Sequence, residues 1–115
     1  MLLKYKSSFK KIAMGLISYM PSEKDVKKLQ ETIDKYEASD EWELYLWKED
    51  VIVGVIGIRL MADGNAELCH LSVNPSFREE GIGKKMIHAV KNKVTGELLP
   101  NQYTKDFLIN VELKQ

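Results

Sequence analysis

The 115-residue chain contains a single cysteine, two histidines and no excess of charge of either sign. The lone Cys69 excludes an intrachain disulfide and a cysteine-based metal site, and the two separated histidines form no zinc cluster. Seventeen basic residues balance seventeen acidic ones, which leaves no overall attraction for nucleic acid or for an anionic membrane. We therefore expect no metal site, no nucleic-acid partner and no membrane partner.

The sequence also lacks a long hydrophobic run. The longest apolar stretch, Val51–Ile58, is too short to span a bilayer, and residues 1–6 lack the apolar core of a signal peptide. No repeat and no linker rich in proline or glycine divides the chain. With 44% hydrophobic residues, the chain can bury one core. These features predict a single domain over residues 1–115 with a cytoplasmic location.

Hydrophobic spacing predicts five strands and four helices in an α/β arrangement with a mixed sheet. The strands are expected at Leu3–Lys6, Trp42–Trp47, Val51–Leu60, Ala66–Val73 and Glu97–Leu99. The helices are expected at Phe9–Met20, Ser22–Tyr36, Ile82–Val94 and Thr104–Ile109, with caps at Ser7-Ser8 and Ser22. Two short turns predict antiparallel hairpins among the middle strands, and a helix before Glu97–Leu99 predicts parallel pairing with Ala66–Val73.

The stretch Arg78-Glu79-Glu80-Gly81-Ile82-Gly83 lies between a predicted strand and a predicted helix. The first N–H groups of a helix have no intrahelical acceptor and carry the positive end of the helix dipole, so this position suits a phosphate. Gly81 permits backbone angles that a Cβ opposes, Gly83 permits close approach, and Arg78 adds a positive charge. The spacing does not fit a P-loop or a dinucleotide-binding fingerprint. A purely structural turn is the alternative.

The same residues, preceded by Val73-Asn74-Pro75, resemble the R/Q-x-x-G-x-G/A motif of the GNAT acetyltransferases. Shorter segments, among them His70–Ser76, resemble the small GNAT members encoded in bacterial riboflavin operons. The resemblance implies an α/β GNAT fold, with a mixed antiparallel and parallel sheet flanked by helices, and acetyl-CoA as the acetyl donor. The chain is too short for the closing hairpin of the family.

The resemblance also implies where acetyl-CoA binds. Main-chain groups of Leu71, Ser72 and Val73 are expected to bond the pantetheine arm, at a place where two parallel strands separate after a bulge. The N–H groups of Glu79, Glu80, Gly81, Ile82, Gly83 and Lys84 are expected to hold the pyrophosphate beside Arg78, and Asn101 to add a polar contact. The carboxylates of Glu79 and Glu80 are expected to point to solvent.

Acyl transfer to an amine requires a neutral amine and a proton source for the leaving thiolate. Glu67 and His70 are the candidates for deprotonating the amine, against the alternatives of a solvated glutamate and a half-buried histidine. In the family, a tyrosine in the last helix supplies the proton, but Leu108 stands at that position and Tyr103 is the remaining candidate. Strand alternation places Cys69 on one face with Glu67, Leu71 and Val73, as a buried residue.

Two functional hypotheses follow from these observations. The first is an acetyl-CoA-dependent N-acetyltransferase that acts on a small-molecule or protein amine, with a link to riboflavin metabolism. The second is a coenzyme A-binding regulatory module without transfer activity, because the usual tyrosine is missing. The alternating residues Asn110–Gln115 predict either a short further strand or a homodimer contact that covers the edge of Glu97–Leu99.

Overall fold

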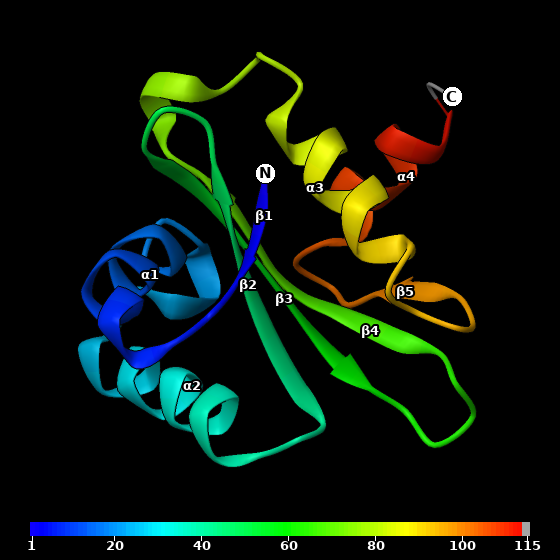
Figure 1. The fold of residues 1–115 in the computed structure, drawn as a ribbon, viewed down its shortest axis with the longest axis horizontal. Coiled ribbons are helices and arrows are strands. Elements are labelled where there is room, and N and C mark those ends of the chain that lie inside the picture. The colour runs from blue at the N-terminus through cyan, green and yellow to red at the C-terminus, as the bar shows by residue number, and fades with distance from the viewer. Residues whose placement is uncertain (114–115) are drawn as a thin grey trace.

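The computed structural model describes the backbone of residues 1–113 and the side chains of residues 1–110. It contains a five-stranded sheet in the order β1-β2-β3-β4-β5, which Figure 1 shows between two layers of helices. The strands are β1 (Leu2–Lys4), β2 (Trp42–Lys48), β3 (Ile52–Leu60), β4 (Ala66–Val73) and β5 (Leu98–Pro100). The first four pair antiparallel and β5 pairs parallel with β4, which confirms the predicted mixed sheet.

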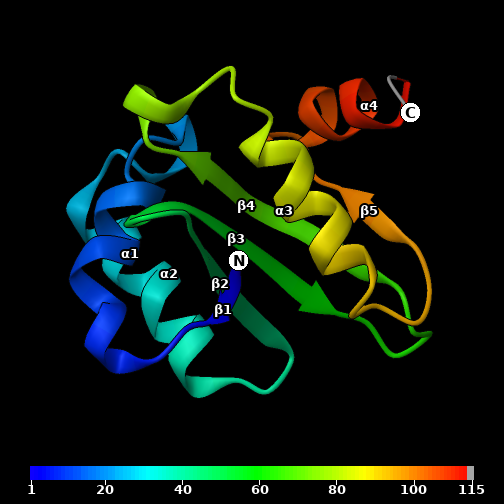
Figure 2. The ribbon, with the colours of Figure 1, turned by 45° about the horizontal axis from the view of Figure 1, so that its top comes forward.

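Helices cover the two faces of the sheet in two groups (Figures 1 and 2). Helices α1 (Lys10–Ile17) and α2 (Val26–Ala38) lie on one face, and α3 (Ile82–Lys91) and α4 (Lys105–Leu113) lie on the other. Central strand β3 supplies Ile56 and Ile58 to the core under α3 and Val55 to the core under α1 and α2. This arrangement explains why β3 is apolar on both faces.

The helix starts differ from the predicted caps. Ser7 and Ser8 belong to a 3-10 turn, Ser7–Phe9, and no side chain caps α1. Pro21–Glu23 forms another 3-10 turn that takes up Ser22, so α2 begins after Asp25 instead. The Asp25 carboxylate accepts hydrogen bonds from the N–H of Lys27 at 2.7 Å and of Lys28 at 3.3 Å, as an N-cap does. Helix α3 also ends at Lys91 rather than at Val94.

A β-bulge in β4 overturns the predicted alternation around Cys69. Gly57 of β3 pairs with His70 and Ile58 pairs with Leu68, so Cys69 is an extra residue without an opposite partner. The insertion shifts the following residues to the other face, and Leu71 and Val73 pack toward α3 together with Leu68. The prediction that Cys69, Glu67, Leu71 and Val73 share a face is therefore wrong.

The C-terminal segment is helical rather than extended. Helix α4 runs through Leu113, so the predicted strand is wrong for Asn110–Leu113, while residues 114–115 lie outside the described part of the chain. The buried side chains of Thr104 and Leu108 anchor the start of this helix, and Leu108 joins the core under α3. The exposed edge of β5 is thus not covered by a strand from residues 110–113.

Two glycines allow a matched test of packing. A Cβ at Gly57 would overlap the Tyr36 hydroxyl, which is buried, whereas a Cβ at Gly15 in α1 would meet nothing within 4 Å. We expect Gly57→Ala to lower the free energy of unfolding by about 1–3 kcal/mol through overpacking. We expect Gly15→Ala to raise it by about 0.5–1 kcal/mol through helix propensity. Urea denaturation measures both changes. An unchanged free energy of unfolding in Gly57→Ala would contradict the close packing of Tyr36 against Gly57.

Candidate functional site

Strands β4 and β5 separate at the bulge. Their parallel pairing ends at Leu68 and Pro100. Beyond this point, the Thr104 hydroxyl donates to the carbonyl of Leu68 at 2.8 Å, and the Asn101 side-chain amide donates to the carbonyl of Cys69 at 3.2 Å. Because these side chains replace strand pairing, the rest of β4 has an edge without a neighbouring strand.

A cavity of about 710 Å³ opens along this free edge of β4. Its lining comes from four segments: the turn after α1, the end of β4, the loop leading into α3, and α4 with the residues before it. The separation of two neighbouring strands thus creates a cleft that is open to a ligand.

The loop between β4 and α3 has the backbone geometry of an anion site. Glu79 and Gly81 both have left-handed backbones, with φ of 70° and 79°. Gly81 is the N-cap of α3, and no side chain caps the helix, so the first N–H groups from Ile82 onward have no intrahelical acceptor. Together with the helix dipole, these amides can bind a phosphate group. We call Arg78–Gly81 and the first turn of α3 the cradle.

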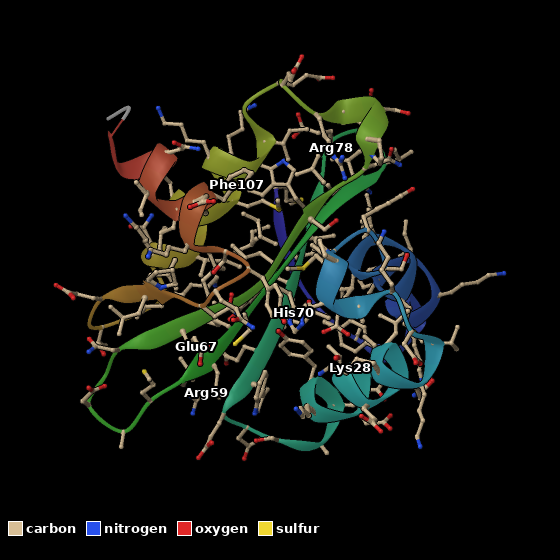
Figure 3. The ribbon with its side chains drawn as sticks, turned by 180° about the vertical axis from the view of Figure 1, so that it is seen from behind. Lys28, Arg59, Glu67, His70, Arg78 and Phe107 are labelled. Atoms are coloured by element: carbon tan, nitrogen blue, oxygen red, sulfur yellow. The ribbon has the colours of Figure 1, made fainter. Side chains whose placement is uncertain are left out.

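Gly83 in the cradle permits a close contact between two helices. A Cβ at this position would overlap the ring of Phe107 from α4. Gly83 was expected to allow a ligand to come close. In the structure, the group that lies close to Gly83 is the ring of Phe107, which also lines the cavity. Figure 3 shows Phe107 and Arg78 at the same end of the sheet. The helix contact therefore forms one wall of the cleft.

The end of β4 offers main-chain groups to the cavity. The Leu71 N–H donates to the Met20 sulfur at 3.4 Å, and the Val73 carbonyl accepts from Arg78 Nε at 3.0 Å. Both groups point away from β3, as the alternation of an antiparallel ladder requires. The Arg78 guanidinium also lies 5.7 Å from the ring centroid of Tyr19. These contacts join the turn after α1 to the cradle across the mouth of the cavity.

Most of the predicted ligand-binding residues meet in this cavity. Those that line it are Leu71, Ser72, Val73, Arg78, Glu79, Gly81, Ile82, Gly83, Lys84 and Tyr103. Glu80 is exposed in the cradle loop, as predicted, but does not line the cavity. The Asn101 side chain accepts from the N–H groups of Tyr103 and Thr104 and so organises the turn before α4. Asn101 therefore holds the turn that positions Tyr103 in the cavity lining, without lining the cavity itself.

The candidate bases Glu67 and His70 lie outside the cavity lining. Figure 3 shows Glu67 beside Arg59 toward the far end of the sheet, with 3.0 Å between the carboxylate and the guanidinium. His70 is buried between β4 and α2. Neither side chain can touch a molecule in the cavity without a change of structure.

His70 is held in a buried hydrogen-bonded network. Its Nε2 lies 2.9 Å from the Glu23 carboxylate, and its Nδ1 lies 2.5 Å from the Tyr36 hydroxyl. The second Glu23 oxygen accepts from the Thr32 hydroxyl at 2.9 Å. Because a carboxylate only accepts, Nε2 carries the hydrogen in its bond to Glu23, and Nδ1 bonds with the Tyr36 hydroxyl. The network joins α2 and its preceding turn to β4, and Glu23 was not identified from the sequence.

Glu23 makes stability depend on acidic pH. Burial by itself raises the pKa of this carboxyl, but the hydrogen bonds from His70 and Thr32 outweigh it and lower the pKa below the ordinary value of 4.5. The stability that ionised Glu23 contributes is complete above pH 4.5 and is lost as pH falls from there through the folded-state pKa. Between pH 5 and 3, we expect the free energy of unfolding of Glu23→Gln, measured by urea denaturation, to fall less steeply than that of the unchanged protein. Equal slopes against pH in the two proteins would contradict this expectation.

The structure also bears on the burial of Cys69 and on the position of the usual tyrosine, where Leu108 stands. Cys69 is buried, as predicted, and burial, followed by the nearby Glu67, raises the pKa of its thiol to about 12. A thiol of that pKa is protonated at neutral pH and is no nucleophile. Leu108, at the position of the usual tyrosine, is 2% exposed and packs in the core. Tyr103 is 52% exposed and is the tyrosine from the last segment that lines the cavity.

Several cavity residues were missed by sequence analysis. Tyr19, Met20 and Pro21 follow α1, Phe77 precedes the cradle, and Phe107 lies in α4. Tyr19 and Phe107 are large side chains that are more than 40% exposed, which is a signal of a binding surface only once the fold is known. Within residues 1–113, no group of three or more His, Cys, Asp and Glu side chains forms a metal site, and no helix could cross a membrane.

Comparisons with known proteins agree with this architecture. Residues 11–103 match the profile of the acetyltransferase (GNAT) family. An uncharacterized N-acetyltransferase in the lysA 3' region of Bacillus methanolicus is 47% identical over 98% of this chain and 96% of its own length.

Solved structures show the same fold at low sequence identity. The aminoglycoside 6'-N-acetyltransferase AAC(6')-IG of Acinetobacter haemolyticus matches with a TM-score of 0.76 and 13% identity, over 99% of this chain and 87% of that one. AAC(6')-Iy, solved with the bisubstrate analog CoA-S-monomethyl-acetylneamine, matches with a TM-score of 0.77 and 16% identity, over 99% and 86%. The chain belongs to the GNAT family of acetyltransferases.

Proposed function

We propose that the protein transfers an acetyl group from acetyl-CoA to an amine. The observation that carries the proposal is that the free edge of β4 and the uncapped start of α3 line one continuous cavity. A pantetheine arm requires main-chain partners along a strand, and a pyrophosphate requires amides and positive charge. The cavity offers both kinds of partner side by side.

The residues present fit coenzyme A. The cradle amides, with the positive charges of Arg78 and Lys84, would hold the phosphates, and the outward main-chain groups of Leu71 and Val73 would hold the arm. Met20 would have to release the Leu71 N–H for this contact. Ser72 lines the cavity, and its hydroxyl is buried and has no hydrogen-bond partner among the described residues. Such an orphaned polar group favours a ligand nearby.

Acetyl-CoA, when bound, supplies the acetyl group as a thioester. In the overall reaction the N–C bond forms, the C–S bond breaks, and the proton lost by nitrogen ends on the thiol. Tyr103 is the proposed proton donor because its side chain lines the cavity. Glu67 and His70 are engaged with Arg59 and Glu23 outside the lining, so we assign deprotonation of the amine to solvent.

Calorimetry with acetyl-CoA and a labelled transfer assay test this proposal. We expect binding with one site per chain, and transfer of labelled acetyl to an amine in a panel that includes cell lysate. The double variant Arg78→Ala, Gly83→Asp should lose both. Binding without any transfer would instead support a coenzyme A-binding regulatory module, and absence of binding would refute both functions.

The proposal extends to the metabolic link, the location, the domain organisation and the oligomeric state of the protein. The resemblance to the small GNAT members encoded in bacterial riboflavin operons supports a link to riboflavin metabolism. The lack of a candidate membrane helix in residues 1–113 is compatible with a cytoplasmic protein. The family match over residues 11–103 supports a single domain. The exposed edge of β5 and the exposed side chains of Tyr103, Phe107 and Ile109 support a homodimer that covers this surface. Light scattering tests the dimer.

A further inference from the structure

Part of the cavity lining is left over once the ligand-binding groups are assigned. Tyr19, Met20 and Pro21 come from the turn after α1, and Tyr103 comes from the segment before α4. We call these four residues the acceptor wall, because the cradle and the β4 edge already account for coenzyme A. All four side chains are apolar or aromatic and carry no formal charge, and the Tyr19 ring lies 5.7 Å from the Arg78 guanidinium.

The charges around the cavity disfavour a polycationic acceptor. Among the described lining residues, Glu79 is the one acidic side chain, and it belongs to the cradle. The nearest buried carboxylate, Glu23, is engaged by His70 at 2.9 Å, and Glu67 is engaged by Arg59 at 3.0 Å. Arg78 and Lys84, which also line the cavity, are assigned to the phosphates of coenzyme A. A ligand with several ammonium groups would therefore find no free carboxylate among the described lining residues outside the cradle.

We infer that the acceptor is an amine with a single basic group on an aromatic or apolar scaffold, bound against the acceptor wall. This inference rests on the proposed function and specifies its substrate class. Flat scaffolds bury apolar area against the Tyr19 and Tyr103 rings and the Met20 side chain, and aromatic pairs add their own attraction. The acceptor would then differ in class from the neamine part of the analog bound by AAC(6')-Iy.

Binding of three probe amines to the full chain saturated with coenzyme A tests the inference. The probes are tryptamine, with one basic group on an aromatic ring, and spermine and neamine as polycations. Calorimetry should show tryptamine binding at least tenfold more tightly than either polycation. Tyr103→Ala should weaken tryptamine binding about tenfold, while Tyr103→Phe should retain it. Val26→Ala, at a residue that is 78% exposed on α2, is a control for nonspecific effects.

The readout separates the acceptor wall from catalysis. A proton-donor role of Tyr103 affects turnover in Tyr103→Phe, whereas a role in the wall affects amine affinity in Tyr103→Ala. Tighter binding of spermine or neamine, no binding of tryptamine, or equal tryptamine affinity in Tyr103→Ala would overturn the inference. Selective tryptamine binding without acetyl transfer would support the acceptor wall and refute the proposed function.

Discussion

Replacing His70 with alanine is expected to lower the free energy of unfolding by about 3–5 kcal/mol at neutral pH, because it strands a buried charge. The Glu23 carboxyl is 2% exposed, and the variant removes the hydrogen bond from His70 that offsets the effect of burial on its pKa, so the carboxylate loses a main stabilising partner. The buried hydroxyl of Tyr36 loses its hydrogen-bond partner in the same variant. Urea denaturation monitored by circular dichroism measures the loss.

Two controls show whether the network is responsible. His88→Ala changes the other histidine, which is half-buried on α3, and should cost less than about 1 kcal/mol. In a double-mutant cycle, His70→Ala combined with Glu23→Gln should cost clearly less than the sum of the two single changes. Additive losses, or a loss below about 1 kcal/mol for His70→Ala, would show that Glu23 and His70 are not energetically coupled.

Exchanging Gly83 for aspartate is expected to weaken coenzyme A binding about 100-fold, which corresponds to about 2.8 kcal/mol. The new carboxylate would compete with phosphate for the amides at the start of α3 and would repel it. Its Cβ would also displace the ring of Phe107. Calorimetry with coenzyme A measures the affinity, and circular dichroism verifies that the variant is folded.

Gly83→Asn separates charge from shape in this prediction. Asparagine has nearly the same size as aspartate and meets the same Phe107 ring, but it adds no negative charge. We expect it to weaken binding about tenfold, or about 1.4 kcal/mol. If Gly83→Asn and Gly83→Asp lose the same affinity, the cradle does not act through charge, and the proposed phosphate site is wrong.

The strands and the cradle were predictable because their signals are local. The hairpins formed by β2, β3 and β4 follow from runs of apolar residues between polar turns, and the start of α3 follows from Gly81 and the apolar spacing after it. In the structure, Gly54 faces Met86 and Gly57 faces Tyr36.

The buried network and the bulge depend on contacts between residues that are far apart in the sequence. Glu23 and His70 are 47 positions apart, and a glutamate reads as a surface residue until its partner is known. The residues of β4 around Cys69 carry no local mark of an insertion, since the bulge is defined by pairing with Gly57 and Ile58. The placement of Glu67 and His70 away from the cavity could therefore not be deduced from alternation.

The end of the chain was ambiguous because two periodicities fit it. Val111 and Leu113 alternate as in a strand, but Phe107, Leu108 and Val111 also recur at helical spacing. The segment forms helix α4 because Leu108 packs in the core, and a helix can continue from Leu108 without a neighbouring strand. The same choice puts Phe107 against Gly83, a contact that the local sequence does not indicate.

The unequal lengths of β4 and β5 have a consequence for amide hydrogen exchange. Strands β3 and β4 pair along most of their length, so their amides exchange mainly through global unfolding. Strand β5 has three residues paired on one edge, and α4 follows it directly, so both can open locally at a lower free energy. A ligand in the cavity would contact the end of β4 and α4. Slower exchange in α4, with unchanged rates in β3, is therefore a direct record of occupancy that requires no knowledge of the reaction.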